Sequence, residues 1–401
     1  MRSLPILLAG LMLSLQAMAQ AAPDAALSTR IEGVVAQAIA EKRLVGAVVL
    51  VSRGGKLIHH QAAGLADREA GRRMQEDAIF RFASVTKPIV STVVMKLVEE
   101  GRLRLDDPVT RFLPDFRPML PDRTQPVITV RQLLTHTSGL SYRFFEPSGS
   151  PYHTLNVSDG MDQPGLSLKE NLRRLGQAPL GFAPGAKWSY SLGIDVLGGV
   201  LEAASGEPLV ALVQRLITGP LGMKDTGFAV ADSTRLAAPY ADGKPEPVKI
   251  TDEMAVPFGA SAILFNPSRA LEPASFASGG AGMVGTAGDL LRFLEVIRTG
   301  GVPILKRGTV AAMMQDQVGV QAATQGPGWG FGYGWAVLDD PQAAATPQAK
   351  GTLQWGGAYG HSWFVDPANE LVVVALTNTT FEGMAGPFVT QLRDAVYGTA
   401  R

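Results

Sequence analysis

The sequence predicts an α/β fold of the α+β type, in which an antiparallel sheet flanked by helices is built from both ends of the chain around a mostly helical insertion. Two observations predict it. Apolar, strand-like runs occur near both ends, within residues 45–63 and 330–378. Between them the chain carries helix-start patterns and loops rich in Gly, Pro and Ser. We therefore expect an α/β domain from residues 20–105 and 285–401, and the helical insertion at 106–284.

The N-terminal elements follow from hydrophobic spacing. Residues 30–42 are expected to form an amphipathic helix, because apolar side chains recur there every three or four positions. Residues 45–51 and 56–63 are expected to form two strands around the turn at 53–55. A further apolar helix is expected from Ser84 to about residue 100. These elements supply the first part of the predicted sheet and a helix to pack against it.

Capping patterns and turn residues divide the rest of the chain. A Thr followed three positions later by Gln or Asp predicts a helix start at Thr129-x-x-Gln132 and at Thr286-x-x-Asp289, the second helix running to about residue 298. Residues 192–204 and 386–397 are also expected to be helical, and 140–166 and 225–278 to be largely irregular. Strands are expected at 330–338, 351–355, 363–366 and 371–378.

The first residues predict export. Arg2 is followed by an apolar stretch at residues 4–15, and Ala17-Met18-Ala19 is a small-x-small cleavage pattern. The stretch is short for a membrane span, although an uncleaved anchor is the alternative interpretation. We expect residues 1–19 to be a signal peptide, cleaved after Ala19, and the mature protein to be periplasmic or secreted without a stable membrane anchor.

Composition excludes several classes of function. The chain has 36 Lys and Arg against 36 Asp and Glu, so no net charge favours nucleic acid as a partner. It has no Cys, which excludes disulfides and a thiolate nucleophile. The five histidines show no compact zinc spacing, and the G-x-G-x-x-G match at 280–285 lacks a surrounding βαβ unit. We expect no metal, no organic cofactor and no obligate protein partner.

Ser84 and Lys87 form an S-x-x-K pattern at the start of the expected helix. A Ser hydroxyl needs a base to act as a nucleophile, and a spacing of three places the lysine amine over the same helix face. The helix N-terminus adds partial positive charge where an oxyanion would form. Taken alone, the pattern also fits a helix cap followed by a surface lysine.

Two later segments add polar chemistry to this pattern. Tyr190 precedes the apolar helix expected at 192–204, and a tyrosine beside a lysine loses its proton more readily and can serve as a general base. Further on, Trp355-Gly356-Gly357-Ala358 ends an expected strand, where glycines permit close approach and the Ala358 N–H could share an oxyanion with the Ser84 N–H. Each segment also fits a plainer interpretation, a loop tyrosine and a β-bulge.

The order and spacing of these segments together resemble the serine β-lactamase and penicillin-binding-protein superfamily, with class C β-lactamases and family VIII carboxylesterases the most similar. The resemblance covers nearly all of the mature chain and rests on residues 82–87, 133–140, 184–185, 190–191, 279–283, 355–357 and 365–367. It implies the β-lactamase/transpeptidase-like fold. It also implies that Ser84 is acylated, that Lys87 and Tyr190 transfer protons, and that the N–H groups of Ser84 and Ala358 form the oxyanion hole.

Two departures from the superfamily's pattern narrow the expected substrate. Leu192 stands where the superfamily's Tyr-x-Asn pattern has its Asn. Trp355 stands where the Lys-Thr-Gly pattern has the lysine that helps bind a carboxylate. A tryptophan offers an apolar wall and only one hydrogen-bond donor. We expect hydrolysis of small, short-chain carboxylic esters, with Trp355, Gly356, Gly357, Ser191, Leu192 and His361 around the substrate. The alternatives are a β-lactamase or D-amino acid peptidase with the same machinery and a non-catalytic penicillin-binding-like protein.

Overall fold

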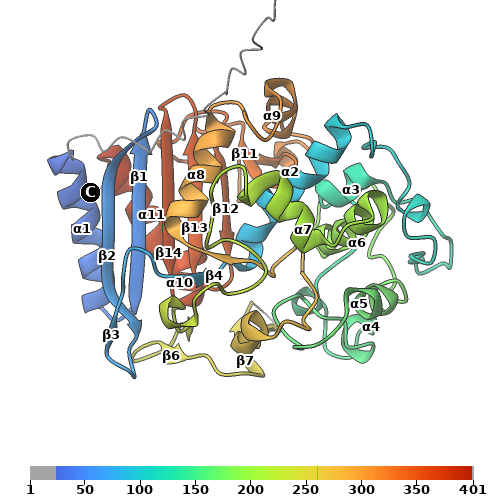
Figure 1. The fold of residues 1–401 in the computed structure, drawn as a ribbon, viewed down its shortest axis with the longest axis horizontal. Coiled ribbons are helices and arrows are strands. Elements are labelled where there is room, and N and C mark those ends of the chain that lie inside the picture. Colours follow the sequence, from blue (N-terminus) through green and yellow to red (C-terminus); the bar gives the residue numbers. More distant parts are fainter. Residues whose placement is uncertain (1–23, 260, 400–401) are drawn as a thin grey trace, which may run out of the picture.

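An eight-stranded antiparallel sheet organises the protein, in a computed structural model that describes residues 24–259 and 261–399 (Figure 1). The strand order is β10-β11-β12-β13-β14-β1-β2-β3. The strands are β1 Gly46–Arg53, β2 Lys56–Asp67, β3 Arg72–Arg73, β10 Trp329–Phe331, β11 Ala336–Leu338, β12 Leu353–Gly357, β13 His361–Asp366 and β14 Leu371–Thr377. Because β1 pairs with β14, with Ala47 opposite Thr377, both ends of the chain form one sheet, which confirms the predicted fold class.

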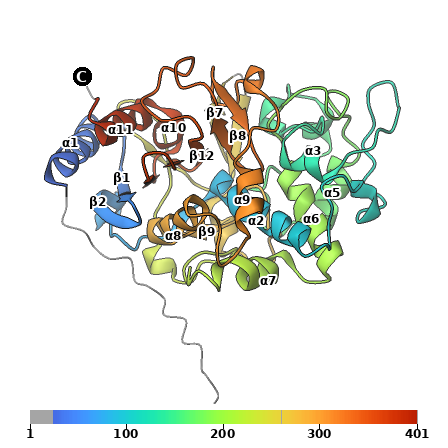
Figure 2. The same cartoon turned by 90° about the horizontal axis from the view of Figure 1, so that it is seen from above.

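Helices cover both faces of this sheet (Figures 1 and 2). Helices α1 (Ala25–Ala40) and α11 (Pro387–Tyr397) pack together on the face where Val49 is buried. Helix α8 (Ala287–Arg298) packs on the opposite face, against β1 and β14. Alternate residues of a strand point to opposite faces, so both faces of β1 must be apolar, and Val48 through Val51 are all buried.

Helix α2 (Thr86–Glu99) lies between the sheet layer and the helical region, and almost all of its residues are buried. The helical region contains α3 Val130–Leu134, α4 Pro151–Thr154, α5 Leu168–Leu175, α6 Gly193–Ser205 and α7 Leu209–Val213. Two further helices, α9 Arg307–Met313 and α10 Thr380–Ala385, lie outside it. A helix buried on all sides is held rigidly by packing, so the residues at its N-terminus have a fixed position.

Small strand pairs complete the fold. They are β4 Phe80–Arg81 with β9 Val284–Gly285, β5 Tyr240–Ala241 with β6 Val248–Lys249, and β7 Met254–Phe258 with β8 Ser261–Phe265. Two of these hairpins lie within the segment 225–278, whose weak periodicity gave no prediction of strands. The domain boundary expected at residue 284/285 lies inside β9, beside the strand that leads to Ser84.

The structure corrects several predicted bounds. The strand expected at 330–338 is two strands, because the chain reverses between them at Gly334, whose φ is +111°. The first helix begins at Ala25 rather than residue 30, since the Asp24 side chain caps it by accepting from the Leu27 N–H. The predicted capping box at Thr129 and Gln132 is present, and α8 ends at Arg298 as predicted.

Within the described residues no single helix is long and apolar enough to cross a membrane. The segments 193–205 and 209–218 reach that length and composition only together, and they are bent by 84°. The signal peptide predicted at residues 1–19 lies outside the described residues.

Candidate active site

Ser84 lies in a short 3₁₀ turn, Ala83–Val85, that leads directly into α2. The preceding residue, Ala83, has a φ of +45°, a left-handed conformation that is strained for a residue with a Cβ. Strain of this kind persists only where the surrounding packing enforces it. The turn fixes Ser84 at the N-terminal end of a buried helix, partly open to a cavity.

The Lys87 amine is buried and has two oxygen neighbours. Its Nζ lies 3.2 Å from Ser84 Oγ and donates a second hydrogen bond, 2.8 Å long, to the carbonyl oxygen of Gly280. The same nitrogen lies 4.6 Å from the ring centroid of Tyr190 and 5.3 Å from that of Tyr142, positions that suit a cation–π contact. Lys87 is therefore held beside the serine by groups on three other segments.

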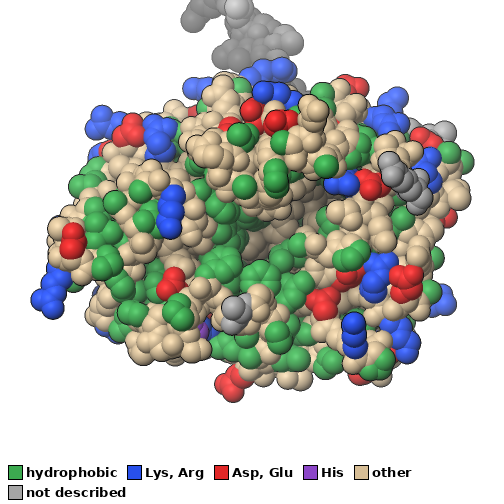
Figure 3. Space-filling model, turned by 180° about the vertical axis from the view of Figure 1, so that it is seen from behind, with side chains coloured by type: hydrophobic (Ala, Val, Ile, Leu, Met, Phe, Trp, Pro, Cys, Tyr) green, Lys and Arg blue, Asp and Glu red, His purple; other side chains and the backbone are tan. Residues whose placement is uncertain are grey.

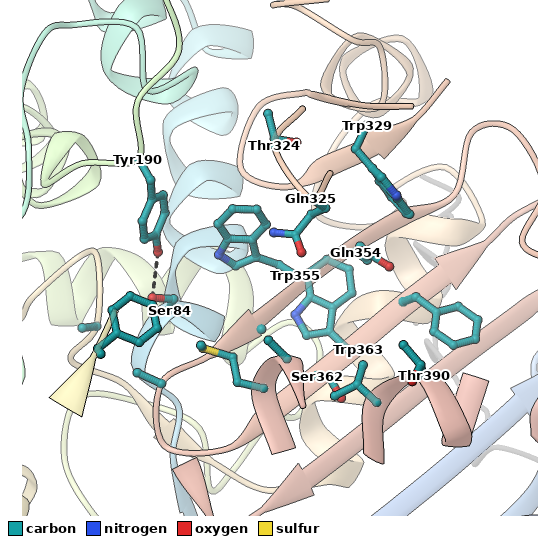
Figure 4. Close-up of a pocket in the computed structure, with 18 of the residues that line it drawn as sticks. Ser84, Tyr190, Thr324, Gln325, Trp329, Gln354, Trp355, Ser362, Trp363 and Thr390 are labelled. Atoms are coloured by element: carbon teal, nitrogen blue, oxygen red, sulfur yellow. Dashed lines mark hydrogen bonds between the residues drawn. The ribbon is translucent and has the colours of Figure 1, made fainter. Parts of the chain in front are cut away.

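The Tyr190 side chain points toward Ser84 (Figure 4). Its hydroxyl lies 2.7 Å from Ser84 Oγ, within the distance needed for direct proton transfer. Its ring contacts those of Trp355, Tyr142 and His136 at centroid separations of 5.2, 5.1 and 4.8 Å. The structure thus brings together Ser84, Lys87 and Tyr190, which the sequence placed up to 106 positions apart.

Tyr142 is a residue of this centre that sequence reasoning missed. It lines the cavity, its ring is tilted by 38° against that of Tyr190, and the Lys87 amine lies over its face. Burial first, and then the nearby Tyr190, hold the pKa of Tyr142 well above its usual value, so this hydroxyl stays protonated. No local pattern marks a single tyrosine after a glycine turn, and only the fold shows its position.

Both glycines of the predicted oxyanion strand lie where a Cβ would collide with a neighbouring segment. A Cβ on Gly357 would collide with the carbonyl oxygen of Phe82, two residues before Ser84. A Cβ on Gly356 would lie 2.7 Å from the His361 carbonyl oxygen. Gly357 therefore lets β12 approach the turn closely, and Gly356 lets it lie close to His361 of β13. The next residue, Ala358, lines the same cavity as Ser84.

Three side chains expected around the substrate lie elsewhere. Ser191, Leu192 and His361 are fully buried and are absent from the cavity lining. Ser191 Oγ lies 3.2 Å from His136 Nδ1, and His361 Nε2 lies 2.8 Å from the Arg81 carbonyl oxygen. Burial lowers the pKa of His361 to about 4. The structure thus places these three side chains in the core and not on the cavity wall.

The cavity beside Ser84 has a volume of about 800 Å³ and a wall rich in aromatic side chains. Seen from behind, the molecule is hollowed near its middle, with hydrophobic side chains around the hollow (Figure 3). Trp355 lies beside Ser84 and Tyr190, with Gln325, Trp329 and Trp363 further along (Figure 4). The other aromatic residues that line the cavity include Phe144, Phe145, Trp188, Phe258 and Phe364. Such a site binds ligands mainly by apolar contact, with a few polar groups to orient them.

Positively charged side chains are scarce around this cavity. Among the described residues that line it, Arg393 is the one Lys or Arg. In residues 24–259 and 261–399, no cluster of three or more His, Asp or Glu could hold a metal ion. The groups within reach of Ser84 Oγ are the Lys87 amine and the Tyr190 phenol.

The chain resembles known proteins over most of its length. Residues 31–397 match the beta-lactamase family model. Esterase EstB of Burkholderia gladioli is 56% identical over 93% of this chain and 96% of that protein. The lovastatin esterase of Penicillium rubens is 28% identical over 83% of this chain and 88% of that protein.

Solved structures agree with these sequence matches. EstCE1, described as a hydrolase with promiscuous acyltransferase activity, superposes with a TM-score of 0.92 at 50% identity, over 94% of this chain and 99% of that one. A penicillin-binding protein homologue from Pyrococcus abyssi superposes with a TM-score of 0.71 at 22% identity, over 93% of this chain and 78% of that one, which shows the shared fold. The serine turn, the buried lysine and the family match thus agree, and the chain belongs to the beta-lactamase family.

Proposed function

We propose that this protein is a serine carboxylesterase that hydrolyses short-chain carboxylic esters through an acyl-enzyme on Ser84. The observation that carries the proposal is the 2.7 Å approach of the Tyr190 hydroxyl to Ser84 Oγ, with Lys87 Nζ 3.2 Å from the same oxygen. A nucleophile within reach of two proton-transfer groups is the arrangement that acyl transfer requires. The name of the 56% identical relative, Esterase EstB, supports the same reaction for this chain.

In the proposed reaction Tyr190, supported by Lys87, takes the proton from Ser84 as Ser84 Oγ attacks the ester carbonyl carbon. The N–H groups of Ser84 and Ala358 stabilise the negative charge on the carbonyl oxygen. The bond to the alcohol oxygen breaks, and Tyr190 returns the proton to that oxygen. A water molecule then attacks the acyl carbon and loses a proton to Tyr190. The bond between that carbon and Ser84 Oγ breaks, Tyr190 returns the proton to Ser84 Oγ, and the acid leaves.

The cavity wall supports neutral esters as substrates. Trp355 and its aromatic neighbours offer apolar contact next to Ser84, whereas a substrate carboxylate would find Arg393 as the one Lys or Arg side chain among the described lining residues. The names of two relatives, Esterase EstB and lovastatin esterase, also indicate ester substrates. A panel of p-nitrophenyl esters from acetate to octanoate tests the short-chain preference, and a maximum at octanoate would refute it.

The nucleophile is tested by Ser84→Ala. We expect loss of p-nitrophenyl butyrate hydrolysis, with the thermal unfolding midpoint unchanged within a few degrees. Retained turnover in the folded variant would refute the assignment. Failure of a fluorophosphonate probe to label the folded wild-type protein would instead favour a non-catalytic binding protein.

A β-lactamase or peptidase activity with the same residues is the enzymatic alternative. It is supported by a D-alanyl-D-alanine carboxypeptidase of Escherichia coli, 31% identical over 56% of this chain and 50% of that protein. Hydrolysis of a cephalosporin ring at a rate that rivals ester cleavage would favour this alternative. If the protein removes only the acetyl side group of such a cephalosporin and leaves the β-lactam ring intact, the esterase assignment is favoured.

Acyl transfer to an alcohol is a second candidate activity. It is supported by the description of EstCE1, 50% identical, as a hydrolase with promiscuous acyltransferase activity, and by the apolar wall beside Ser84, which disfavours water. We expect a fraction of the butyryl groups from p-nitrophenyl butyrate to appear as benzyl butyrate when benzyl alcohol is added. Butyric acid as the sole product would exclude the transfer.

We also propose that the protein is exported, with residues 1–19 removed. The support is the charged, apolar and small-residue pattern of that segment. Intact-mass measurement of the protein from its native host should give a chain of 401 − 19 = 382 residues. A full-length mass in the cytoplasmic fraction would contradict the proposal.

A further inference from the structure

His136 holds the backbone on both sides of Tyr190. Its carbonyl oxygen accepts a hydrogen bond of 2.8 Å from the Ser189 N–H. Its ring Nδ1 lies 3.3 Å from the Ser191 nitrogen, whose N–H donates to it, and 3.2 Å from Ser191 Oγ. One residue therefore contacts both chain neighbours of Tyr190, although it lies 55 positions before Ser191.

The His136 ring also packs against the Tyr190 ring. The two centroids are 4.8 Å apart with an interplanar angle of 59°, and Phe331 of β10 lies on His136 at 5.3 Å. His136 is 1% exposed and has a φ of +55°, a left-handed conformation that costs free energy for a residue with a Cβ. The surrounding structure therefore enforces this position of the ring against Tyr190.

The contact with Ser191 requires a neutral imidazole. An N–H that donates to Nδ1 leaves no place for a proton on that nitrogen, which fixes the tautomer with its proton on Nε2. Burial first, and then the positive charge of Lys87 on α2, hold the pKa of His136 well below its usual value. Trp188 and Phe331, which pack on other sides of the ring, carry no charge.

We propose that His136 is a positioning residue that sets the hydroxyl of Tyr190 against Ser84 by accepting the Ser191 N–H and packing on the phenol ring. The proposal rests on the proposed role of Tyr190 in proton transfer. A hydrogen-bond acceptor on each side of Tyr190 limits rotation of its backbone, and the imidazole limits rotation of its ring. A small displacement of a proton-transfer group is sufficient to lower a catalytic rate.

Two substitutions distinguish the effect of the hydrogen-bond acceptor of His136 from the effect of its aromatic ring. His136→Phe keeps an aromatic ring and loses the acceptor, whereas His136→Asn keeps an acceptor near the Nδ1 position and loses the ring. We expect His136→Phe to lower kcat for p-nitrophenyl butyrate by about tenfold or more, with KM changed less than about twofold. His136→Asn should keep kcat within about threefold of wild type. His153→Asn on α4 is the control and should leave both constants unchanged.

A double-mutant cycle with Tyr190→Phe tests whether His136 acts through Tyr190. The readout is the rate of fluorophosphonate labelling of Ser84, which remains measurable over hours in slow variants. We expect His136→Phe to slow labelling about tenfold in the wild-type background and less than about twofold in the Tyr190→Phe background. Equal slowing in both backgrounds, or no slowing in either, would overturn the proposal.

The cycle also distinguishes this inference from the proposed function. If Tyr190→Phe alone labels at the wild-type rate, the proposed proton-transfer role of Tyr190 is wrong, and the positioning role falls with it. If Tyr190→Phe is slow but His136→Phe slows labelling equally in both backgrounds, only the positioning role is wrong. If His136→Phe does not fold, His136→Asn tests the acceptor by itself, and a loss of about tenfold or more in its kcat would overturn the proposal.

Discussion

The Lys87 amine donates a hydrogen bond of 2.8 Å to the carbonyl oxygen of Gly280, on a segment almost two hundred positions later in the chain. The same amine lies 3.2 Å from Ser84 Oγ, so Gly280 fixes the lysine beside the nucleophile. A Cβ at Gly280 would collide with the Asp195 carboxylate, so glycine is the residue that fits there. The glycine-rich stretch at 279–283 thus holds the lysine in place.

Replacing Lys87 should remove this arrangement. We expect Lys87→Met to lower kcat/KM for p-nitrophenyl butyrate by about 10²- to 10⁴-fold, because a positioned proton-transfer group contributes that much to a rate. Lys96→Met, on the same helix and paired with Glu99 rather than with Ser84, is the matched control and should keep full activity. Comparable loss in both variants would show that the helix, and not the Lys87 amine, was affected.

Gly357→Ala should separate β12 from the nucleophile turn. The added Cβ would collide with the Phe82 carbonyl oxygen, and relief of that overlap costs about 1–3 kcal/mol of stability. We expect a lower unfolding midpoint in urea together with a large loss of kcat. Gly33→Ala, at an open site on α1, should instead be neutral or stabilising by about 0.5–1 kcal/mol. Full activity in Gly357→Ala would contradict the close approach described here.

Phe258→Ala should widen the cavity. Phe258, at the end of β7, lines the cavity and contacts Phe144 and Phe381 at centroid separations of 5.8 and 5.0 Å. Each additional CH₂ that is buried contributes about 0.8 kcal/mol, so larger esters should gain about three- to tenfold in kcat/KM relative to small ones. Two series of esters test this prediction. One series varies the length of the acyl chain, and the other varies the size of the alcohol. No shift in either series would show that Phe258 does not limit substrate size.

His361 should make stability depend on pH. Burial lowers its pKa to about 4, below the value of about 6.5 in an unfolded chain. The unfolded chain then binds a proton that the folded chain refuses, so the stability contributed by His361 is complete above about pH 6.5 and decreases as the pH falls. Between pH 7 and pH 5 this loss is about 2 kcal/mol.

The control for this pH effect is His361→Gln, which keeps a side-chain N–H for the Arg81 carbonyl oxygen but does not titrate. Urea unfolding at pH 7 and pH 5 should show a smaller pH dependence in the variant, by about 2 kcal/mol. The same pH dependence in both proteins would mean that His361 accepts a proton in the folded state.

The sequence predicted the parts of the fold that local patterns determine. The capping residues at Thr129 and Thr286 mark helix starts because their side chains bond the backbone three positions on. The strand pairing of both chain ends was predicted from apolar runs, since strands buried on both faces have few other arrangements. Gly334 was not recognised as a reversal, because a single glycine also fits inside a strand.

The candidate site was predicted only where local sequence patterns mark its residues. Ser84, Lys87 and Tyr190 lie in recognisable segments, and the structure brings them together. Tyr142 and the Gly280 carbonyl depend on long-range packing, which leaves no local signature. Ser191 and Leu192 were misplaced because neighbours of a site residue in sequence point to different sides of a turn.

Intact-protein mass spectrometry tests the central claim most directly. Wild-type protein mixed with p-nitrophenyl butyrate and quenched in acid within the first turnovers should carry one added butyryl group, located by peptide mapping on Ser84. Tyr190→Phe should accumulate the same adduct more slowly, and Ser84→Ala should carry none. A butyryl group on another residue would contradict an acyl-enzyme on Ser84. So would hydrolysis without any detectable adduct, if that hydrolysis persists in Ser84→Ala.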